Sequence, residues 1–163
     1  MKYLVIILLA LPIHGCIFDH SSDGQIVVRS GWAFGLCAVT YCRAEVTITK
    51  TRATFIAIDT RDPKVPPIEV SDILHPGEWQ SISDYLDTMP TTDTVIGTPD
   101  GVDEGEEWIE VTQLEKTVRV RVSCGEDIPG VEDLQQNVRA VRNRLASLVG
   151  FGGICMVSRF AST

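Results

Sequence analysis

Apolar residues recur at two different spacings along this chain, and each spacing predicts a kind of element. A period of two, enriched in β-branched residues, is typical of half-buried strands. It occurs over five segments, 26–30, 44–50, 53–59, 108–114 and 117–124. In the last segment Val118, Val120 and Val122 share one face, while Arg119 and Arg121 share the other. This alternation predicts an antiparallel sheet with one face in the core and one in solvent.

Spacings of three and four predict two helices. The first covers 76–89, with Pro76 near its start and Pro90 just after its end. The second covers 130–149, with Pro129 at its start and Gly150 after it. The segment 90–106 between the helix and the next strand is polar and contains prolines and glycines, which indicates a loop.

The order of these elements predicts an α+β fold. Two helices, the longer one near the C-terminus, would cover one face of an antiparallel sheet of about five strands. The chain has 163 residues, a length that normally folds around one core. We therefore expect a single two-layer domain over 26–163.

The first 15 residues have the pattern of an export signal. Lys2 supplies a positive charge, and an unbroken apolar run follows from Tyr3 to Leu11. That run is much shorter than the roughly 20 residues needed to span a bilayer as a helix. We predict a signal peptide over 1–15; the alternative is a buried N-terminal strand or helix.

The residues Ile13-His14-Gly15-Cys16 resemble the lipobox of bacterial lipoproteins. In that family an aliphatic residue stands three positions before an acylated cysteine and a small residue one position before it; His14 departs from the small residue usual at its place. The resemblance implies lipid, such as palmitate, on Cys16, and anchoring to the cell membrane or outer membrane. The polar composition of 16–25 fits a flexible tether. The alternative is an ordinary secretory signal, with Cys16 just inside the exported chain.

Charge narrows the range of partners. The chain has 14 basic and 22 acidic residues, a formal net charge of −8. Nucleic-acid binding relies on neutralising phosphates with Lys and Arg, so this composition argues against it. No Lys or Arg lies between Lys64 and Lys116, a stretch that is rich in Asp and Glu.

Three acids in this stretch, Asp100, Asp103 and Glu104, are candidate binding residues. Several carboxylates on a flexible loop can suit calcium. The spacing, however, does not match an EF-hand loop. A solvated acidic loop is the main alternative.

The chain has five cysteines. With Cys16 assigned to lipid, four remain, namely Cys37, Cys42, Cys124 and Cys155. Exported chains meet oxidising conditions, in which cysteines tend to pair, and four allow three connectivities. We favour Cys37–Cys42 with Cys124–Cys155; the alternative is reduced cysteines that serve in packing. A zinc site would need about four Cys or His ligands, and we expect no metal and no cofactor.

The segment 30–42 is dense in glycine, aromatic residues and cysteine. Its Ser-Gly-Trp-Ala-Phe-Gly-Leu-Cys run and following Tyr-Cys, the stretch 97–111, and the Ile-Pro-Gly at 128–130 resemble a family of small uncharacterised bacterial envelope proteins. The family would carry a further cysteine pair where this chain has Thr98 and Gly101. The resemblance implies a fold and no activity. Trp32, Phe34 and Tyr41 are candidate binding residues within this segment.

These patterns predict an exported, lipid-anchored envelope protein whose domain is a binding or interaction module for an unknown protein or small molecule. The alternative is an envelope hydrolase, or an inhibitor of one, that uses His75 or the acidic 97–107 loop. His75 is the one imidazole in the domain beyond the tether, and no Gly-x-Ser-x-Gly signature accompanies it. We therefore assign no catalytic residue.

Overall fold

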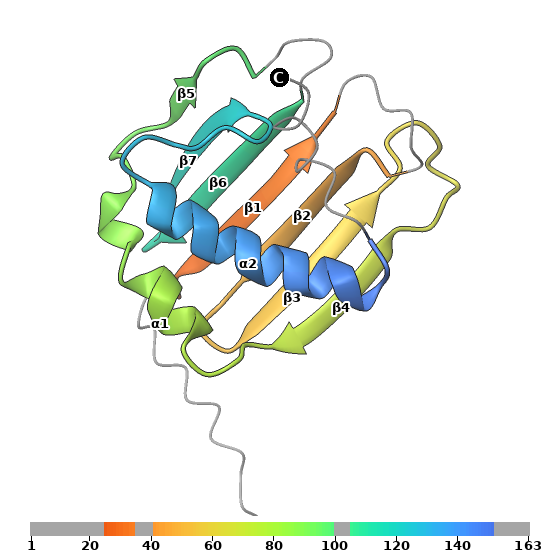
Figure 1. Cartoon of the computed structure of the whole chain (residues 1–163), viewed down its shortest axis with the longest axis horizontal. Helices are drawn as coiled ribbons and strands as arrows, with labels where there is room; N and C mark the ends of the chain where they lie inside the picture. The colour runs from red at the N-terminus through yellow and green to blue at the C-terminus, as the bar shows by residue number, and fades with distance from the viewer. Residues whose placement is uncertain (1–24, 35–40, 100–104, 152–163) are drawn as a thin grey trace, which may run out of the picture.

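The computed structural model describes residues 25–34, 41–99 and 105–151 (Figure 1). The strands in this part of the chain are β1 Val27–Ala33, β2 Arg43–Ile48, β3 Arg52–Ile58, β4 Ile68–Ile73, β5 Thr94–Ile96, β6 Glu106–Gln113 and β7 Lys116–Ser123. The helices are α1 Glu78–Ser83, the 3-10 helix η1 Leu86–Thr88 and α2 Glu132–Leu148.

All seven described strands belong to one sheet, in the order β4-β3-β2-β1-β6-β7-β5. Neighbouring strands are antiparallel except β5, which runs parallel to β7. The predicted α+β class and the position of the longer helix near the C-terminus are confirmed. The expectation of about five antiparallel strands is wrong, because the sheet has seven strands and is mixed.

The two strands that the pattern missed both lie at edges of the sheet. β4 follows Pro66 and Pro67, and its residues are only half-buried or exposed. β5 has three residues and lies within the segment 90–106 that composition marks as a loop. An edge strand has only one neighbour and buries less of its surface, so its hydrophobic signal is weak.

The first predicted helix, 76–89, is two shorter segments. α1 begins after Gly77, whose φ of 88° is left-handed and favours glycine. η1 follows Tyr85, whose φ of −113° lies outside the helical range. The apolar spacing nevertheless identified the buried side, because Ile82 is fully buried and Trp79 packs against the core.

The second predicted helix, 130–149, is confirmed as α2. Gly130 and Gly150 flank it with φ values of 80° and 68°. Its buried residues include the predicted apolar stripe of Leu134, Val138, Val141 and Leu145.

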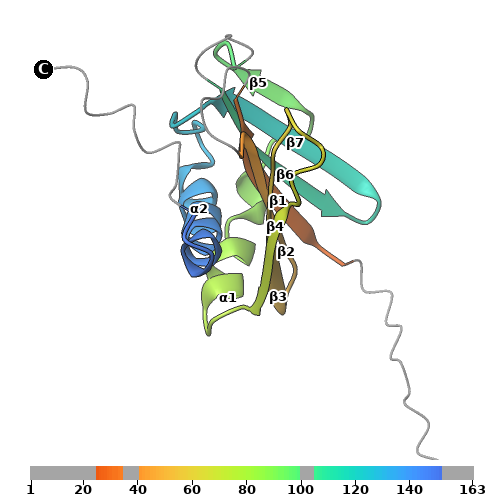
Figure 2. The same cartoon turned by 90° about the vertical axis from the view of Figure 1, so that its right-hand side faces the viewer.

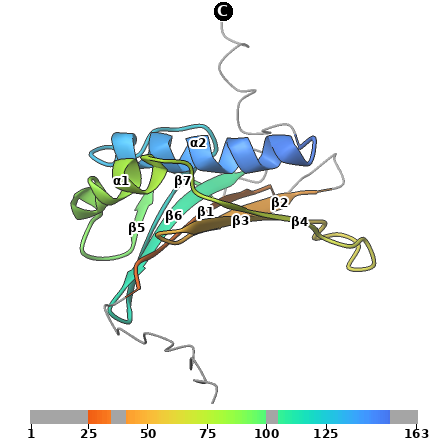
Figure 3. The same cartoon turned by 90° about the horizontal axis from the view of Figure 1, so that it is seen from below.

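Both helices lie on one face of the sheet (Figures 2 and 3). α2 crosses the strands from the β7 side to the β4 side, with α1 beside it (Figure 1). The core fills the space between α2 and the sheet, and its fully buried members include Val28, Val46, Phe55, Leu134 and Val138. No described helix covers the other face, which we call the open face.

The register defines two ends of the sheet. Ala33 pairs with both Arg43 and Glu106, and these three residues mark what we call the loop end. Val27 pairs with Thr112, close to the β6–β7 turn, at what we call the hairpin end. The described chain therefore starts at the hairpin end, and β1 ends with Ala33 at the loop end.

Candidate functional site

Trp32 lies in the core and is only 1% exposed. Its ring centroid lies 6.3 Å from that of Phe55 and 6.1 Å from that of Phe151. The guanidinium of Arg142 stacks on the ring, 4.7 Å from the centroid. The interpretation of Trp32 as a partner-contacting residue is therefore corrected: on β1 its side chain points to the helix face, together with Val28, where packing against α2 buries it.

Phe34 and Tyr41 are both half-buried at the loop end. Phe34 packs over Gly105, where an added Cβ would lie 2.5 Å from the Phe34 ring. The hydroxyl of Tyr41 donates a hydrogen bond to the carbonyl of Pro66 at 3.3 Å. These two aromatic residues are partly accessible at the same end of the sheet.

The acidic candidates Asp100, Asp103 and Glu104 lie outside the described residues. The described part of the chain holds no cluster of three or more His, Cys, Asp or Glu that could bind a metal ion. Of the described acids of the 97–107 segment, Glu106 is partly exposed and pairs with Arg121 at 3.4 Å, whereas Glu107 is fully buried.

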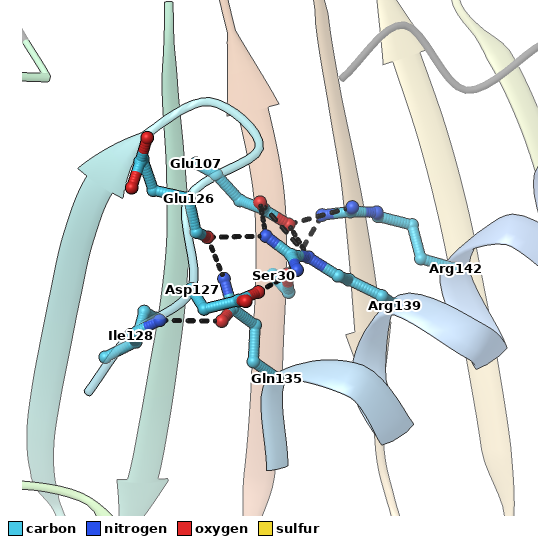
Figure 4. A network of polar contacts seen from close by, with 8 residues as sticks. All are labelled: Ser30, Glu107, Glu126, Asp127, Ile128, Gln135, Arg139 and Arg142. Carbon is cyan, nitrogen blue, oxygen red and sulfur yellow. Dashed lines mark hydrogen bonds and ion pairs between the residues drawn. The ribbon is translucent and has the colours of Figure 1, made fainter. Parts of the chain in front are cut away.

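Glu107 is fully buried between the sheet and α2 (Figure 4). Arg139 donates hydrogen bonds to both of its carboxylate oxygens, including one of 3.0 Å from Nε to Oε1. A guanidinium nitrogen of Arg142 lies 2.9 Å from Oε1. Arg142 is itself 3% exposed and donates a hydrogen bond to the hydroxyl of Ser30 at 3.2 Å.

Burial and charge act in opposite directions on this cluster. Burial alone would raise the pKa of the Glu107 carboxyl, but hydrogen bonds from Arg139 and the charges of Arg142 and Arg139 outweigh it, so its pKa lies below the usual value. Burial lowers the pKa of Arg142, against the attraction of Glu107. Glu107 is thus held as a carboxylate.

The same cluster fixes the segment between β7 and α2. Arg139 donates hydrogen bonds to the carboxylate of Asp127 and to the backbone carbonyl of Glu126. The side chain of Gln135 accepts from the Ile128 N–H and donates to the same Glu126 carbonyl (Figure 4). Because its acceptors are occupied and it has no solvent access, Glu107 stabilises the fold and is a poor general acid or base.

The sequence carried a signal for this cluster. Glu107, Ile109 and Val111 alternate along β6, so the period of two places Glu107 on the buried face. Arg142 follows Val138 by four positions and therefore lies on the apolar side of α2. The polar composition of 97–107 predicts a loop and does not reveal that β6 already begins at Glu106.

A second polar cluster covers the open face. Trp108 is 3% exposed because its ring lies across Gly31, and the guanidinium groups of Arg43 and Arg119 cover it at 5.3 and 5.9 Å from its centroid. Glu110 beside it accepts from Arg119 at 2.9 Å and lies 3.5 Å from Arg29. Arginine side chains and their carboxylate partners thus keep an uncovered sheet face polar.

His75 lies at the hairpin end and is exposed. The neighbouring Leu74 N–H bonds to Thr51 in the β2–β3 turn, and the His75 N–H donates to the carboxylate of Glu78. Glu107, at the start of β6, lies near the opposite end. The structure therefore does not bring His75 and the described acids of the 97–107 segment together.

Cys42 and Cys124 both lie at the loop end. Cys42 precedes β2, is 1% exposed and accepts a hydrogen bond from the Phe34 N–H. The Cys124 N–H, just after β7, donates to Gly105. Cys16, Cys37 and Cys155 lie outside the described residues.

In the part of the chain that the structure describes, no helix is both long and apolar enough to cross a membrane. The chain matches no known family model, and no curated protein resembles it at a significant level.

Proposed function

We propose that this chain is an exported, lipid-anchored protein of the bacterial cell envelope, and that its α+β domain is a binding or interaction module. The observation that carries the proposal is the sequence Ile13-His14-Gly15-Cys16 directly after a short apolar run. An apolar segment of that length suits a cleaved signal. Lipid on Cys16 would hold the chain at the cell membrane or outer membrane.

The geometry favours a binding role over an enzymatic one. A nucleophile, a base and an orienting group must converge in an active site. His75 is exposed at one end of the sheet, while Glu107 is enclosed by arginines toward the other. The eight residues of β6 extend over about 26 Å between those ends. The hydrolase alternative therefore gains no support from the described residues.

The loop end is the surface that we assign to the partner. Phe34 and Tyr41 are half-buried there, and the loop 59–67 lies beside them through the bond from Tyr41 to Pro66. A mixture of partly exposed aromatic side chains and polar loop backbone is typical of protein-binding surfaces.

Disulfides at the loop end form part of the proposal. Cys42 precedes β2 and Cys124 follows β7, and β1 and β6 lie between these two strands, which are therefore about 14 Å apart. A disulfide needs Cα atoms within about 7 Å, so we expect these two cysteines not to bond to each other. If both form disulfides within the chain, each pairs with Cys37 or Cys155, which leaves two of the three connectivities.

Mass spectrometry of the protein purified from bacterial membranes tests the anchoring. We expect a mature chain that begins at Cys16 and carries the added mass of lipid, and we expect Cys16→Ser to move the protein from the membrane to the soluble fraction. An unmodified Cys16, or a chain that still begins at Met1, contradicts the proposal. Peptide mapping without reduction on the same sample tests the disulfides, since a Cys42–Cys124 peptide would contradict the assigned geometry.

A further inference from the structure

A groove of about 610 Å³ opens at the hairpin end, between η1 and the β6–β7 hairpin. Its apolar lining residues are Leu86, Met89, Pro90, Val111, Leu114 and Val118. Lys116 and Asp87 add charge of both signs. The walls of the groove are therefore mostly apolar, carry little net charge and can contact a hydrocarbon chain.

The turn beside this groove is strained. Leu114 and Glu115 form a two-residue turn between Gln113 and Lys116, with φ values of 49° and 66°. Such a turn favours Asn-Gly, because side chains other than glycine, asparagine and aspartate fit poorly at positive φ. Leu114 is also 72% exposed, more than any other large hydrophobic residue in the described ranges. Strained backbone is concentrated at functional sites, so the exposed apolar side chain makes this turn a candidate contact.

The hairpin end is also where the described chain starts. Val27 pairs with Thr112, and Ile26 packs against the core next to that pair. Cys16 precedes Gln25 by nine positions, and nine residues reach at most about 32 Å. A lipid on Cys16 would therefore hold the hairpin end within about 32 Å of the bilayer.

We propose that the hairpin end rests on the lipid bilayer, with Leu114 inserted at the boundary of headgroups and acyl chains and the groove open to hydrocarbon. The proposal rests on the proposed anchoring through Cys16. Because the tether already supplies proximity, a weak contact is sufficient to orient the domain. Burying one leucine side chain favours the contacting state by about tenfold to a hundredfold.

The charges at this end indicate the type of lipid. Lys116 can pair with a headgroup phosphate, whereas Asp87 and Glu115 are repelled by a strongly anionic surface. A zwitterionic phospholipid surface fits this balance. In this orientation the loop end, with Phe34 and Tyr41, points away from the membrane and is open to a partner.

The test attaches the chain to vesicles without relying on acylation. The chain from position 16 onward, with Cys16→Ser and an N-terminal hexahistidine tag, is bound to phosphatidylcholine vesicles that contain a nickel-chelating lipid and brominated acyl chains. Leu114→Trp places a fluorophore at the turn.

Val95→Trp is the matched control, because Val95 is an apolar residue on β5 that is 51% exposed and paired with Arg121, away from the hairpin turn. We expect brominated lipid to quench Leu114→Trp beyond the background of the natural tryptophans, and not Val95→Trp. Equal quenching of the two variants overturns the proposal.

A second measurement keeps the natural Leu114, because tryptophan itself has an affinity for membrane interfaces. Hydrogen exchange of the turn amides 114–116 should slow several-fold when the tagged chain with its natural Leu114 is attached to vesicles. Leu114→Asp should remove that slowing. Exchange that does not respond to attachment, or that slows equally in Leu114→Asp, overturns the membrane contact. Because the tag replaces the lipid, this result is independent of the mass of Cys16, so the anchoring and the contact can fail separately.

Discussion

Trp108 lies so close to Gly31 on the open face that no side chain fits between them. A Cβ at position 31 would lie 2.5 Å from the indole Cζ2 of Trp108 and 2.4 Å from the backbone carbonyl of Ala44 on the neighbouring strand. The indole could rotate away, but the carbonyl belongs to the β1–β2 pairing. The absence of a side chain at position 31 therefore allows a large aromatic ring to be buried on an uncovered sheet face.

Gly31→Ala should lower the free energy of unfolding by about 3 kcal/mol. The added Cβ would clash with a backbone carbonyl, which cannot move aside without disturbing the strand pairing. Urea denaturation followed by circular dichroism measures this change. Gly130→Ala is the control, since a Cβ there meets nothing within 4 Å and only the φ of 80° is unfavourable. That strain costs about 1 kcal/mol. Equal losses in the two variants would contradict the packing argument.

The parts of the fold that the sequence predicted are those with a strong, regular signal. α2 and the β6–β7 pair carry apolar stripes that burial enforces along their whole length, as in Val118, Val120 and Val122. β5 carried no such signal, because three residues at an edge bury too little surface to need a pattern. The apolar spacing over 76–89 identifies the buried side of this segment, but the helix is interrupted near Tyr85.

The candidate site was harder to predict. Trp32 lies among aromatic and glycine residues in the sequence, which is typical of a binding segment. Its side chain nevertheless points to the same side of β1 as Val28, and it is buried in the core. The Glu107 cluster joins residues from β6, α2 and β1, including Arg142 and Ser30, which are 112 positions apart. Contacts across such separations depend on how α2 lies on the sheet, which local periodicity does not specify.

Glu107→Gln should destabilise the protein by about 3–5 kcal/mol. The variant leaves Arg142 buried without a counter-charge, and breaking one partner of a buried ion pair has this cost. Chemical denaturation at neutral pH gives the difference. Glu106→Gln on the same strand is the matched control, because its partner Arg121 is 3.4 Å away and both side chains are partly exposed. An exposed pair of that kind contributes less than about 1 kcal/mol. Similar losses in both variants would show that the buried cluster has no special role.

Acid should destabilise the native protein partly through Glu107. Its pKa is lowered in the folded state, so its contribution is complete above the unfolded value of about 4.3 and is lost as pH falls through the lower, folded pKa. The urea midpoint should therefore be steady from neutral pH to about pH 5 and then fall. Glu107→Gln, which has no proton to take up at this position, should show a smaller drop between pH 5 and pH 3. A drop as large as that of the natural chain would exclude Glu107 as a source of the acid sensitivity.

Arg144 should hold the β4 edge to the helices. It donates hydrogen bonds to Asp72 at 2.7 Å and to both carboxylate oxygens of Glu78 at 2.9 Å, and so connects α2, β4 and α1. The hydrogen bond from Arg144 lowers the pKa of Asp72, so this carboxylate keeps its charge into more acidic solution than a free aspartate does. Lysine keeps the charge but cannot make two parallel bonds to a carboxylate. We expect Arg144→Lys to speed amide exchange in 68–74 by about tenfold with little effect on β6, because β4 is an edge strand that can open locally. Arg121→Lys, at a partly exposed pair with Glu106, provides the comparison. Uniform acceleration across the whole sheet in Arg144→Lys would instead indicate global destabilisation.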